Sequence, residues 1–380
     1  MNDLNEPWVE LPTARFLLRW LSGDEMSGGG ELMSFSEPAA LAGWLTRQGL
    51  GALAYGRCRP EEAGLRRCLQ ADMFSAAAES SLKQTSLQAI LRAFAAAGVQ
   101  MALLKGAVLS LTVYEEPAWR TMSDIDIWTP AEAMQAAAAV MTGLGYVVTV
   151  KGERPFALQQ LSRGEIQFVQ PNMPAGLVEL HWSAFSGWWL TRTAAVDEAG
   201  LWARRELLSD WPDVAQLAAE DMVIHLAVHT AVNHQFGLSA LRSLVDIALT
   251  AHKRGVDWAV AAERARTWRV GTAVYTVLSL LDELIGVEGL AVALEQLRPT
   301  GWRSRAIGRF VTPASVLAGR DLRSGWQRFL LLLLLVDRKR DMAKLVWRTL
   351  WPEQEWLAAR YGRSVSHWRH LWTMLRQRAV

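Results

Sequence analysis

Apolar residues recur at helical spacing through most of the first hundred positions. They predict a helix around Leu11–Leu21, and helical spacing resumes from about Pro38 to Gly98. The intervening glycine-rich stretch, Ser22 to Ser34, is typical of a loop. Gly98 follows the alanine-rich SSLKQTSLQAILRAFAAAGV, where a glycine suits a helix C-cap. The chain is therefore expected to begin with helices.

The middle third instead alternates short apolar strands with one helix. MALLKG predicts a buried strand entering a turn, AEAMQAAAAVMTGLG predicts a helix ended by Gly143 and Gly145, and YVVTVK predicts a further strand. EIQFVQ and LVELHW predict two more strands, with PNMPAG as the turn between them. From Val214 onward the signals are almost wholly helical. The apolar run FLLLLLLV, Phe329 to Val336, is eight residues long, whereas a membrane-spanning helix needs about 20, so it predicts a buried core helix.

These patterns predict an α+β fold of mixed α/β character, with a small mixed β-sheet between N-terminal helices and a large C-terminal helical domain. We expect a helical region over 1–84, the sheet-containing core over 85–205 and the helical domain over 206–380. A length of 380 residues agrees with more than one lobe.

Composition and charge narrow the class of protein. Hydrophobic residues make up 51% and charged residues 21%, which is globular rather than disordered composition. Cys58 and Cys68 lack metal-ligand spacing, and the start MNDLNEPWVE shows no secretory signal, so a reducing, cytoplasmic location and no membrane association are expected. Residues 301–380 carry 16 Lys and Arg against 5 Asp and Glu, a net +11, whereas 1–300 carry −9. This basic segment either meets an anionic partner or pairs with the acidic lobe.

The candidate chemistry lies in the predicted strands. On a strand, Asp124 and Asp126 share a face while Ile125 and Ile127 point into the core. Two adjacent carboxylates repel each other and need a cation, for which Mg²⁺ is well suited. LVELHW supplies a third carboxylate, Glu179. The structural alternative is that the aspartates end a turn or cap a helix and that Glu179 is a solvated strand residue.

The order of a glycine turn, Asp-Ile-Asp-Ile and then Val-Glu-Leu resembles the nucleotidyltransferase superfamily that includes DNA polymerase beta. Within it, the chain resembles a bacterial family of uncharacterised nucleotidyltransferases. The resemblance covers about Thr85 to Leu249 well and LWPEQEWLAARYG more loosely. It rests on LLKGAVL, the arginine of AWRTMSDIDIW, GLGYVV, VELHW, HLAVHTAVNH and LRSLVDIAL.

The resemblance implies the reaction. One or two Mg²⁺ ions held by Asp124, Asp126 and Glu179 would bridge the phosphates of a nucleoside triphosphate and align an acceptor hydroxyl for attack on the α-phosphorus, and pyrophosphate would leave. Glu179 could also help to deprotonate the acceptor. The three carboxylates are therefore the expected catalytic and metal-binding residues of a nucleotidyltransferase core over 85–205.

The expected nucleotide-binding residues surround these carboxylates. At the glycine turn, Lys105 and Gly106 depart from the superfamily's usual Gly-Ser or Gly-Gly pair, so backbone amides rather than a serine hydroxyl would hold phosphate. Lys105 either contributes charge to the triphosphate or extends from the strand edge. Arg120 steadies the phosphates or binds the acidic cluster. The full expected set is Lys105, Gly106, Arg120, His181, His229 and Arg242.

Three interpretations stay open for the helical histidines. His225 and His229 lie four residues apart on one face, with Asp221 one turn earlier. They could bind zinc, although a third ligand is not evident, pack as hydrogen-bonded core residues, or close the cleft opposite the carboxylates. Arg242 and Asp246 are also four apart and either pair with each other or join that wall. The 19 tryptophans, spread over the chain, are expected to be packing residues rather than base-stacking ones.

Three functions compete. The first is an Mg²⁺-dependent nucleotidyltransferase acting on an unknown acceptor, with a small molecule or a peptide favoured over RNA. The second is a toxin-like enzyme acting on RNA, with the basic C-terminal segment as the RNA surface, whose binding would weaken steeply with salt. The third is a catalytically silent module that binds nucleotide or a partner. The sequence leaves the acceptor, the base and the oligomeric state open.

Overall fold

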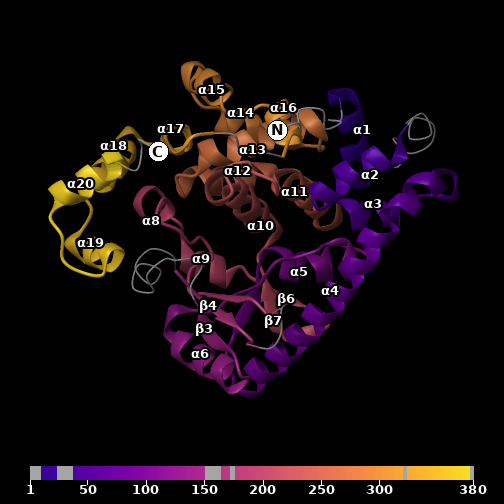
Figure 1. The fold of residues 1–380 in the computed structure, drawn as a ribbon, viewed down its shortest axis with the longest axis horizontal. Helices are drawn as coiled ribbons and strands as arrows, with labels where there is room; N and C mark the ends of the chain where they lie inside the picture. Colours follow the sequence, from indigo (N-terminus) through magenta and orange to yellow (C-terminus); the bar gives the residue numbers. More distant parts are fainter. Residues whose placement is uncertain (1–9, 24–36, 150–163, 172–175, 320–322, 377–380) are drawn as a thin grey trace.

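The computed structural model describes residues 10–23, 37–149, 164–171, 176–319 and 323–376. A mixed β-sheet occupies the lower half of the molecule in Figure 1, and a large group of helices covers it from above. One continuous hydrophobic core runs through both parts, from Ala14 to Leu345. The structure therefore has the expected α+β fold.

The sheet has seven strands in the order β3-β4-β5-β2-β1-β7-β6. Strands β2 and β5 are parallel, as are β1 and β7, and the other neighbouring pairs are antiparallel. The strands are β1 (Met101–Leu103), β2 (Ile125–Trp128), β3 (Val147–Thr149), β4 (Glu165–Val169), β5 (Val178–His181), β6 (Glu206–Leu208) and β7 (Trp211–Gln216). Every residue of β1, β2 and β5 is buried, which agrees with strands in the middle of a covered sheet.

Helices precede and flank the sheet, as the hydrophobic spacing predicts. They are α1 (Leu11–Leu21), α2 (Pro38–Arg47), α3 (Gly51–Arg57), η3 (Pro60–Glu62), α4 (Ala63–Ala96), α5 (Lys105–Thr112), η4 (Pro117–Trp119), η5 (Ala131–Ala133) and α6 (Met134–Gly143). The long helix α4 runs along one side of the sheet (Figure 1). Gly98 follows its end at φ +65°, in the left-handed conformation expected of a terminating glycine. Much of the predicted glycine-rich loop and of the PNMPAG turn lies outside the described residues.

Most of the remaining helices form the upper part of the molecule and a C-terminal group at its left edge, while α9 lies beside the sheet (Figure 1). They are α8 (Leu190–Thr193), α9 (Glu198–Ala203), α10 (Ala219–Val228), η6 (His229–Asn233), α11 (Ala240–Arg254), α12 (Trp258–Thr267), α13 (Gly271–Leu284), α14 (Leu290–Leu297), α15 (Gly301–Ile307), α16 (Pro313–Leu317), α17 (Gly325–Leu334), α18 (Lys339–Leu350), α19 (Gln354–Tyr361) and α20 (His367–Arg376). Helix α17 contains most of the leucine run and buries Leu331, Leu332 and Leu334. Within the described residues, every helix is too short or too polar to cross a bilayer.

The expectation of helix from Val214 onward is wrong at its start. Residues 206–216 form the hairpin β6–β7, and Val214 and Ala215 of β7 pair with β1. The alanine-rich start of α10 directly follows β7, but Val214 and Ala215 pair with a strand more than a hundred residues earlier, and this pairing decides the conformation of β7. The sheet therefore continues beyond residue 205, and helix α10 begins only at Ala219.

Candidate active site

The parallel pairing of β2 with β5 brings two of the expected carboxylates together. Asp126 lies opposite Glu179, and two positions further on Trp128 lies opposite His181. Directly opposed residues of neighbouring strands project from the same face. Asp126, Glu179 and His181 are buried, and one ligand atom from each lies within 4.8 Å of the others. Asp124 immediately precedes β2, is less buried than Asp126, and is not part of this close group.

Two nitrogen donors converge on one oxygen of Asp126. Lys105 Nζ lies 2.6 Å from Oδ1 of Asp126, and Nε2 of His181 lies 3.0 Å from the same atom. Burial opposes the charge of Lys105, but the attraction of Asp126 and Glu179 outweighs it and raises the pKa of the lysine. Burial likewise opposes the charge of Asp126, yet Lys105 and His181 hold the pKa of this carboxyl below its ordinary value. Asp126 is therefore a charged carboxylate in a buried ionic cluster.

Asp124 experiences a different environment. Burial raises the pKa of Asp124, and the negative charges of Asp126 and Glu179 raise it further. Its Oδ1 accepts a hydrogen bond of 2.8 Å from the Ser123 hydroxyl. The repulsion expected between neighbouring carboxylates is thus present, and a cation between them would relieve it.

Strand β4 adds two side chains that the sequence did not suggest. Its antiparallel register places Glu165 opposite His181 and Gln167 opposite Glu179. Gln167 Nε2 donates to Oε1 of Glu179 at 2.6 Å, and Glu165 Oε2 lies 3.6 Å from Nδ1 of His181. Glu165 also accepts a hydrogen bond from the Ser186 hydroxyl at 3.1 Å. The Gln167 hydrogen bond fixes the orientation of Glu179, and Glu165 places a negative charge beside His181.

The donor set fits a divalent cation. One carboxylate oxygen of Asp126 and one of Glu179 lie within 4.8 Å of each other. Carboxylate oxygens are the ligands that Mg²⁺ takes in proteins. Lys105 and His181 both contact Oδ1 of Asp126, so neither uses Oδ2. Asp126 and Glu179, with Asp124 at the edge of β2, are therefore the residues that could hold the ion.

Arg120 has a partner that the sequence did not suggest. Its Nε and Nη2 donate to the two carboxylate oxygens of Asp246 at 2.7 and 2.8 Å, and its Nη1 donates to the Thr121 carbonyl. The Tyr114 hydroxyl also donates to Asp246, at 2.7 Å. The guanidinium thus binds neither the acidic cluster nor a site open to phosphate, but joins the segment before β2 to helix α11.

Arg242 lies near the Arg120–Asp246 ion pair but contacts a different residue. Its Nη1 lies 3.3 Å from both oxygens of Thr121, whereas the described hydrogen bonds to the Asp246 carboxylate come from Tyr114 and Arg120. Repulsion by Arg120, together with burial, lowers the pKa of Arg242 to about 10. The hydrogen bonds of Arg242 thus go to the segment that leads to Asp124, and the carboxylate of Asp246, one of the two partners considered for Arg242, is held by Arg120 and Tyr114.

The glycine turn is closely packed against the same segment. A Cβ at Gly106 would lie 3.0 Å from Cβ of Met122 and 3.3 Å from Nη1 of Arg120, so a side chain here would force one of them to move. Buried Lys83 of α4 donates to the Met122 carbonyl from the other side. Gly106 thus lets the start of α5 approach the chain just before Asp124.

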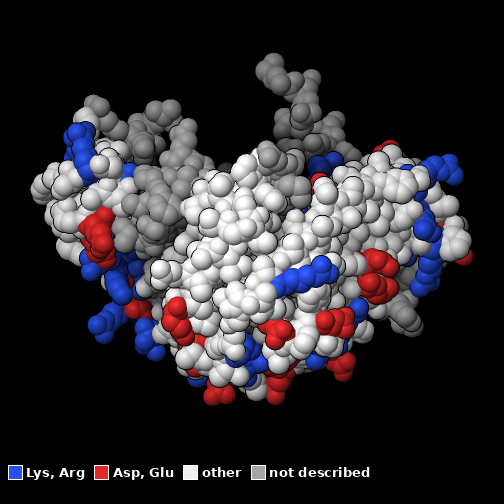
Figure 2. Space-filling view, turned by 90° about the horizontal axis from the view of Figure 1, so that it is seen from below, with Lys and Arg blue, Asp and Glu red and all other residues white. Residues whose placement is uncertain are grey.

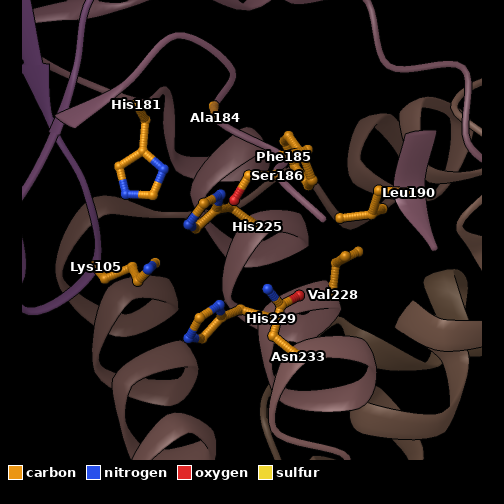
Figure 3. A pocket seen from close by; sticks show the side chains of 10 residues that line it. All are labelled: Lys105, His181, Ala184, Phe185, Ser186, Leu190, His225, Val228, His229 and Asn233. Carbon is orange, nitrogen blue, oxygen red and sulfur yellow. The ribbon is translucent and has the colours of Figure 1, made fainter. Parts of the chain in front are cut away.

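A pocket lies next to the ionic cluster and has the helical histidines as its other wall. It is lined by Lys105, His181, Ala184, Phe185, Ser186, Leu190, His225, Val228, His229 and Asn233, and has about 250 Å³ of empty volume, part of it open to solvent. Figure 3 shows Lys105, His181, His225 and His229 around this space. Of the three interpretations of the histidines, the geometry agrees with the wall opposite the carboxylates.

Burial keeps the wall histidines uncharged. His225 is 3% exposed, and neither ring nitrogen has a hydrogen-bond partner within the described structure. Burial, reinforced by the charge of Lys105, lowers the pKa of His225 to about 3 and lowers that of His229 well below its ordinary value. Nε2 of His229 lies 2.7 Å from Nε2 of His234. His225 thus presents an unpaired neutral imidazole beside the pocket.

The backbone of this wall departs from a regular α-helix. His229–Asn233 forms a π-helical turn at the end of α10, and Gln235 and Phe236 follow with φ of +49° and +59°. π-Helical turns occur frequently at functional sites because they redirect side chains. Here the turn brings both His229 and Asn233 to the pocket.

Comparison with known families and structures gives one match. A family model described as "Uncharacterised nucleotidyltransferase" matches residues 36–286, about two-thirds of the chain. The matched range contains the whole described sheet, the ionic cluster and the histidine wall. Searches of curated proteins and of solved structures found no match.

Proposed function

This chain belongs to the uncharacterised nucleotidyltransferase family and is a transferase of phosphorus-containing groups; from that premise we propose an Mg²⁺-dependent reaction centred on Asp124, Asp126 and Glu179. A nucleoside triphosphate would donate its nucleoside monophosphate to an acceptor hydroxyl, with release of pyrophosphate. The acceptor would be a small molecule or a peptide. When bound, the ion would neutralise charge that develops on the phosphates and lower the pKa of the attacking group.

The observation that carries this proposal is the register of β2 and β5. It sets Asp126 and Glu179 side by side on one face, and β4 holds Glu179 in place through Gln167. A catalytic group must be held to within a fraction of an ångström, which rigid strands achieve better than loops. Asp126 and Glu179 would hold the ion, and Asp124 would complete its carboxylate set.

Lys105 and Gly106 would act on the phosphate side. The ammonium of Lys105 is already held at the cluster by Asp126, so it could stabilise a triphosphate oxygen without a large movement. Gly106 lies in the first turn of α5, where free backbone N–H groups favour an anion. Arg120 is bonded to Asp246 through both arms of its guanidinium, and we assign it a positioning role.

The pocket beside Lys105 would receive the acceptor. Carboxylates are absent from its described lining, and the neutral His225 and His229 face Lys105 and His181 across it. A ring nitrogen of His225 could form a hydrogen bond with an acceptor hydroxyl, because neither nitrogen has a partner within the described structure. This bond would offset the free-energy cost of leaving a buried polar atom unpaired. His225 and His229 would therefore orient the acceptor rather than bind a metal.

The test of this function has two stages. First, the protein is incubated with each nucleoside triphosphate, Mg²⁺ and a cell extract, and mass spectrometry identifies a species that gains a nucleotide mass. Second, Glu179→Gln is compared with the wild type on that acceptor. The substitution keeps the shape and the Gln167 contact site but removes the charge, so transfer should fall by roughly a hundredfold or more.

Nucleotide affinity distinguishes an enzyme from a binding module in the same experiment. We expect Glu179→Gln to change the Kd for the triphosphate by less than about tenfold, since Asp124 and Asp126 remain. Glu283→Gln, at an exposed ion pair with Arg15, is the matched control and should leave transfer unchanged. If the Glu179→Gln variant transferred the nucleotide at the wild-type rate, Glu179 would not be a catalytic residue.

A further inference from the structure

The C-terminal helices expose large aromatic side chains, contrary to the expectation that the tryptophans pack inside the protein. Trp347 of α18 is 59% exposed, and Trp368 and Trp372 of α20 are 73% and 55% exposed. Leu350, at the end of α18, is 42% exposed. Exposed apolar side chains that cluster, unlike isolated ones, mark an interaction site.

These side chains form one continuous surface. Trp347 stacks on Trp351 at a centroid distance of 6.0 Å, and Trp351 meets Trp368 edge-on at 5.7 Å. Trp372 lies one helical turn beyond Trp368 on α20. We call this set, Trp347, Leu350, Trp351, Trp368 and Trp372, the tryptophan surface.

The two helices that bear the tryptophan surface also expose basic side chains. On α18, Arg340 and Lys344 are exposed along the same stripe as Trp347, at intervals of three or four residues. On α20, Arg369 is exposed next to Trp368. Asp341, the one carboxylate of α18, is buried, and α20 contains none. Figure 2 shows blue Lys and Arg side chains at its left edge, on the side where Figure 1 places these helices, and others at its right edge.

We propose that the tryptophan surface binds the headgroup region of an anionic lipid bilayer, with the C-terminal helices lying along the membrane surface. An amphipathic helix with Trp and Leu on one face and Lys and Arg at its border suits that position. Indole rings concentrate at the membrane–water interface, and Lys and Arg near the surface are attracted to anionic lipids. The site is separate from the ionic cluster and does not depend on the reaction proposed above.

Two observations favour lipid over single-stranded nucleic acid. Base stacking needs an open aromatic face, and the central ring of the surface, Trp351, already stacks on Trp347 and, at 4.4 Å and 4°, on His367. Leu350 contributes exposed aliphatic surface, which has no stacking partner in a nucleic acid but gains from transfer into a bilayer. The acidic Glu353, between α18 and α20, is paired with Arg192 and Arg348.

The membrane surface would lie close to the pocket. Helix α18 packs on α8, and α8 begins with Leu190, one of the residues that line the pocket. Arg192 of α8 binds Glu353, in the short connection from α18 to α19. A bilayer held at α18 and α20 is therefore held beside the helix that borders the pocket.

The experiment measures co-sedimentation of the full chain with vesicles of phosphatidylcholine, with and without phosphatidylglycerol. We expect binding only when phosphatidylglycerol is present, and weaker binding as salt increases. The double variant Trp347→Ala/Trp368→Ala should bind at least about tenfold more weakly, because binding scales with the apolar area buried. Lys344→Gln/Arg369→Gln should weaken binding by about fivefold per charge.

A matched control uses tryptophans of similar exposure on other helices. Trp302 of α15 and Trp326 of α17 are 54% and 53% exposed, so Trp302→Ala/Trp326→Ala removes comparable area and should bind like the wild type. Circular dichroism verifies that both double variants fold. The proposal is overturned if the wild type ignores phosphatidylglycerol vesicles or if the two double variants bind alike. It is also overturned if the Trp347/Trp368 variant loses binding to a single-stranded RNA oligonucleotide while vesicle binding persists.

Discussion

The buried contact between Arg120 and Asp246 offers a sharp test of how the active site is held. Asp246 is fully buried and accepts three hydrogen bonds of 2.7 to 2.8 Å, two from Arg120 and one from Tyr114. Arg120 lies four residues before Asp124, so the contact fixes the segment that leads into β2 against helix α11. Asp246→Asn keeps the size of the side chain but removes its charge.

The structure sets the expected cost of this substitution. An uncompensated guanidinium would remain in a buried place, next to Arg242, whose pKa is already lowered by the charge of Arg120. Removing one partner of a buried ion pair destabilises a protein by about 3–5 kcal/mol. The free energy of unfolding should fall by about this amount. An exposed pair contributes about 0–1 kcal/mol, so Glu283→Gln should change it by no more than that.

Urea unfolding, followed by circular dichroism, measures both variants. A third variant, Arg120→Met/Asp246→Leu, removes both charges and should recover part of the lost stability, since the buried cation is no longer left alone. A loss below about 1 kcal/mol for Asp246→Asn would refute the reasoning, and Arg120 would return as a candidate for phosphate binding. The Kd for the triphosphate, corrected for the fraction of each variant that is folded, distinguishes a structural role of Arg120 from phosphate binding.

Three further predictions concern the metal and the histidines. Calorimetry should show Mg²⁺-dependent triphosphate binding that Asp126→Asn weakens, and equal binding by both proteins with and without Mg²⁺ would contradict the site. The purified protein should contain no stoichiometric zinc, and His229→Ala should leave its metal content unchanged; zinc present in the wild type and lost from the variant would contradict this. His225 has a pKa of about 3 in the folded chain against 6.5 unfolded, so its contribution to stability is present above pH 6.5 and is lost as the pH falls from there toward 3. Between pH 7 and pH 5 the wild type should lose about 2 kcal/mol more than His225→Phe, measured by urea unfolding at each pH, and parallel profiles would show that His225 is protonated in the folded state.

Local signals predict the fold where local interactions decide it. The spacing of apolar residues locates α1 at its observed bounds, and Gly98 ends the first helical region as expected. The hairpin β6–β7 could not be found in this way. Pro212 and Val214 do not favour helix, but six residues give too weak a local signal to identify a strand, and β7 is held by its pairing with β1, which lies more than a hundred residues away in sequence.

The candidate site shows the same division. The alternation of residues along LVELHW predicts that Glu179 and His181 share a face, and the grouping of both with Asp126 within 4.8 Å agrees with this. Glu165 and Gln167 were missed because their contribution depends on the register between β4 and β5. A one-residue shift of that register would turn both side chains to the opposite face. The alternating polar residues of EIQFVQ indicate that Glu165 and Gln167 share a face. They do not indicate which residues of β5 these side chains contact, because that depends on the register.

The backbone conformation of Lys105 bears on how this site works. Its φ of +49° lies in the left-handed region, which a glycine adopts freely and a lysine adopts at a cost of about 1–2 kcal/mol. A lysine at this turn therefore needs a compensating interaction. The contact of 2.6 Å between its ammonium and Asp126 supplies one, because a buried carboxylate without a cation would cost more than the strained backbone. Lys105 therefore balances the charge of the carboxylates within the chain itself, and the metal ion proposed for this site would have to share Asp126 with it.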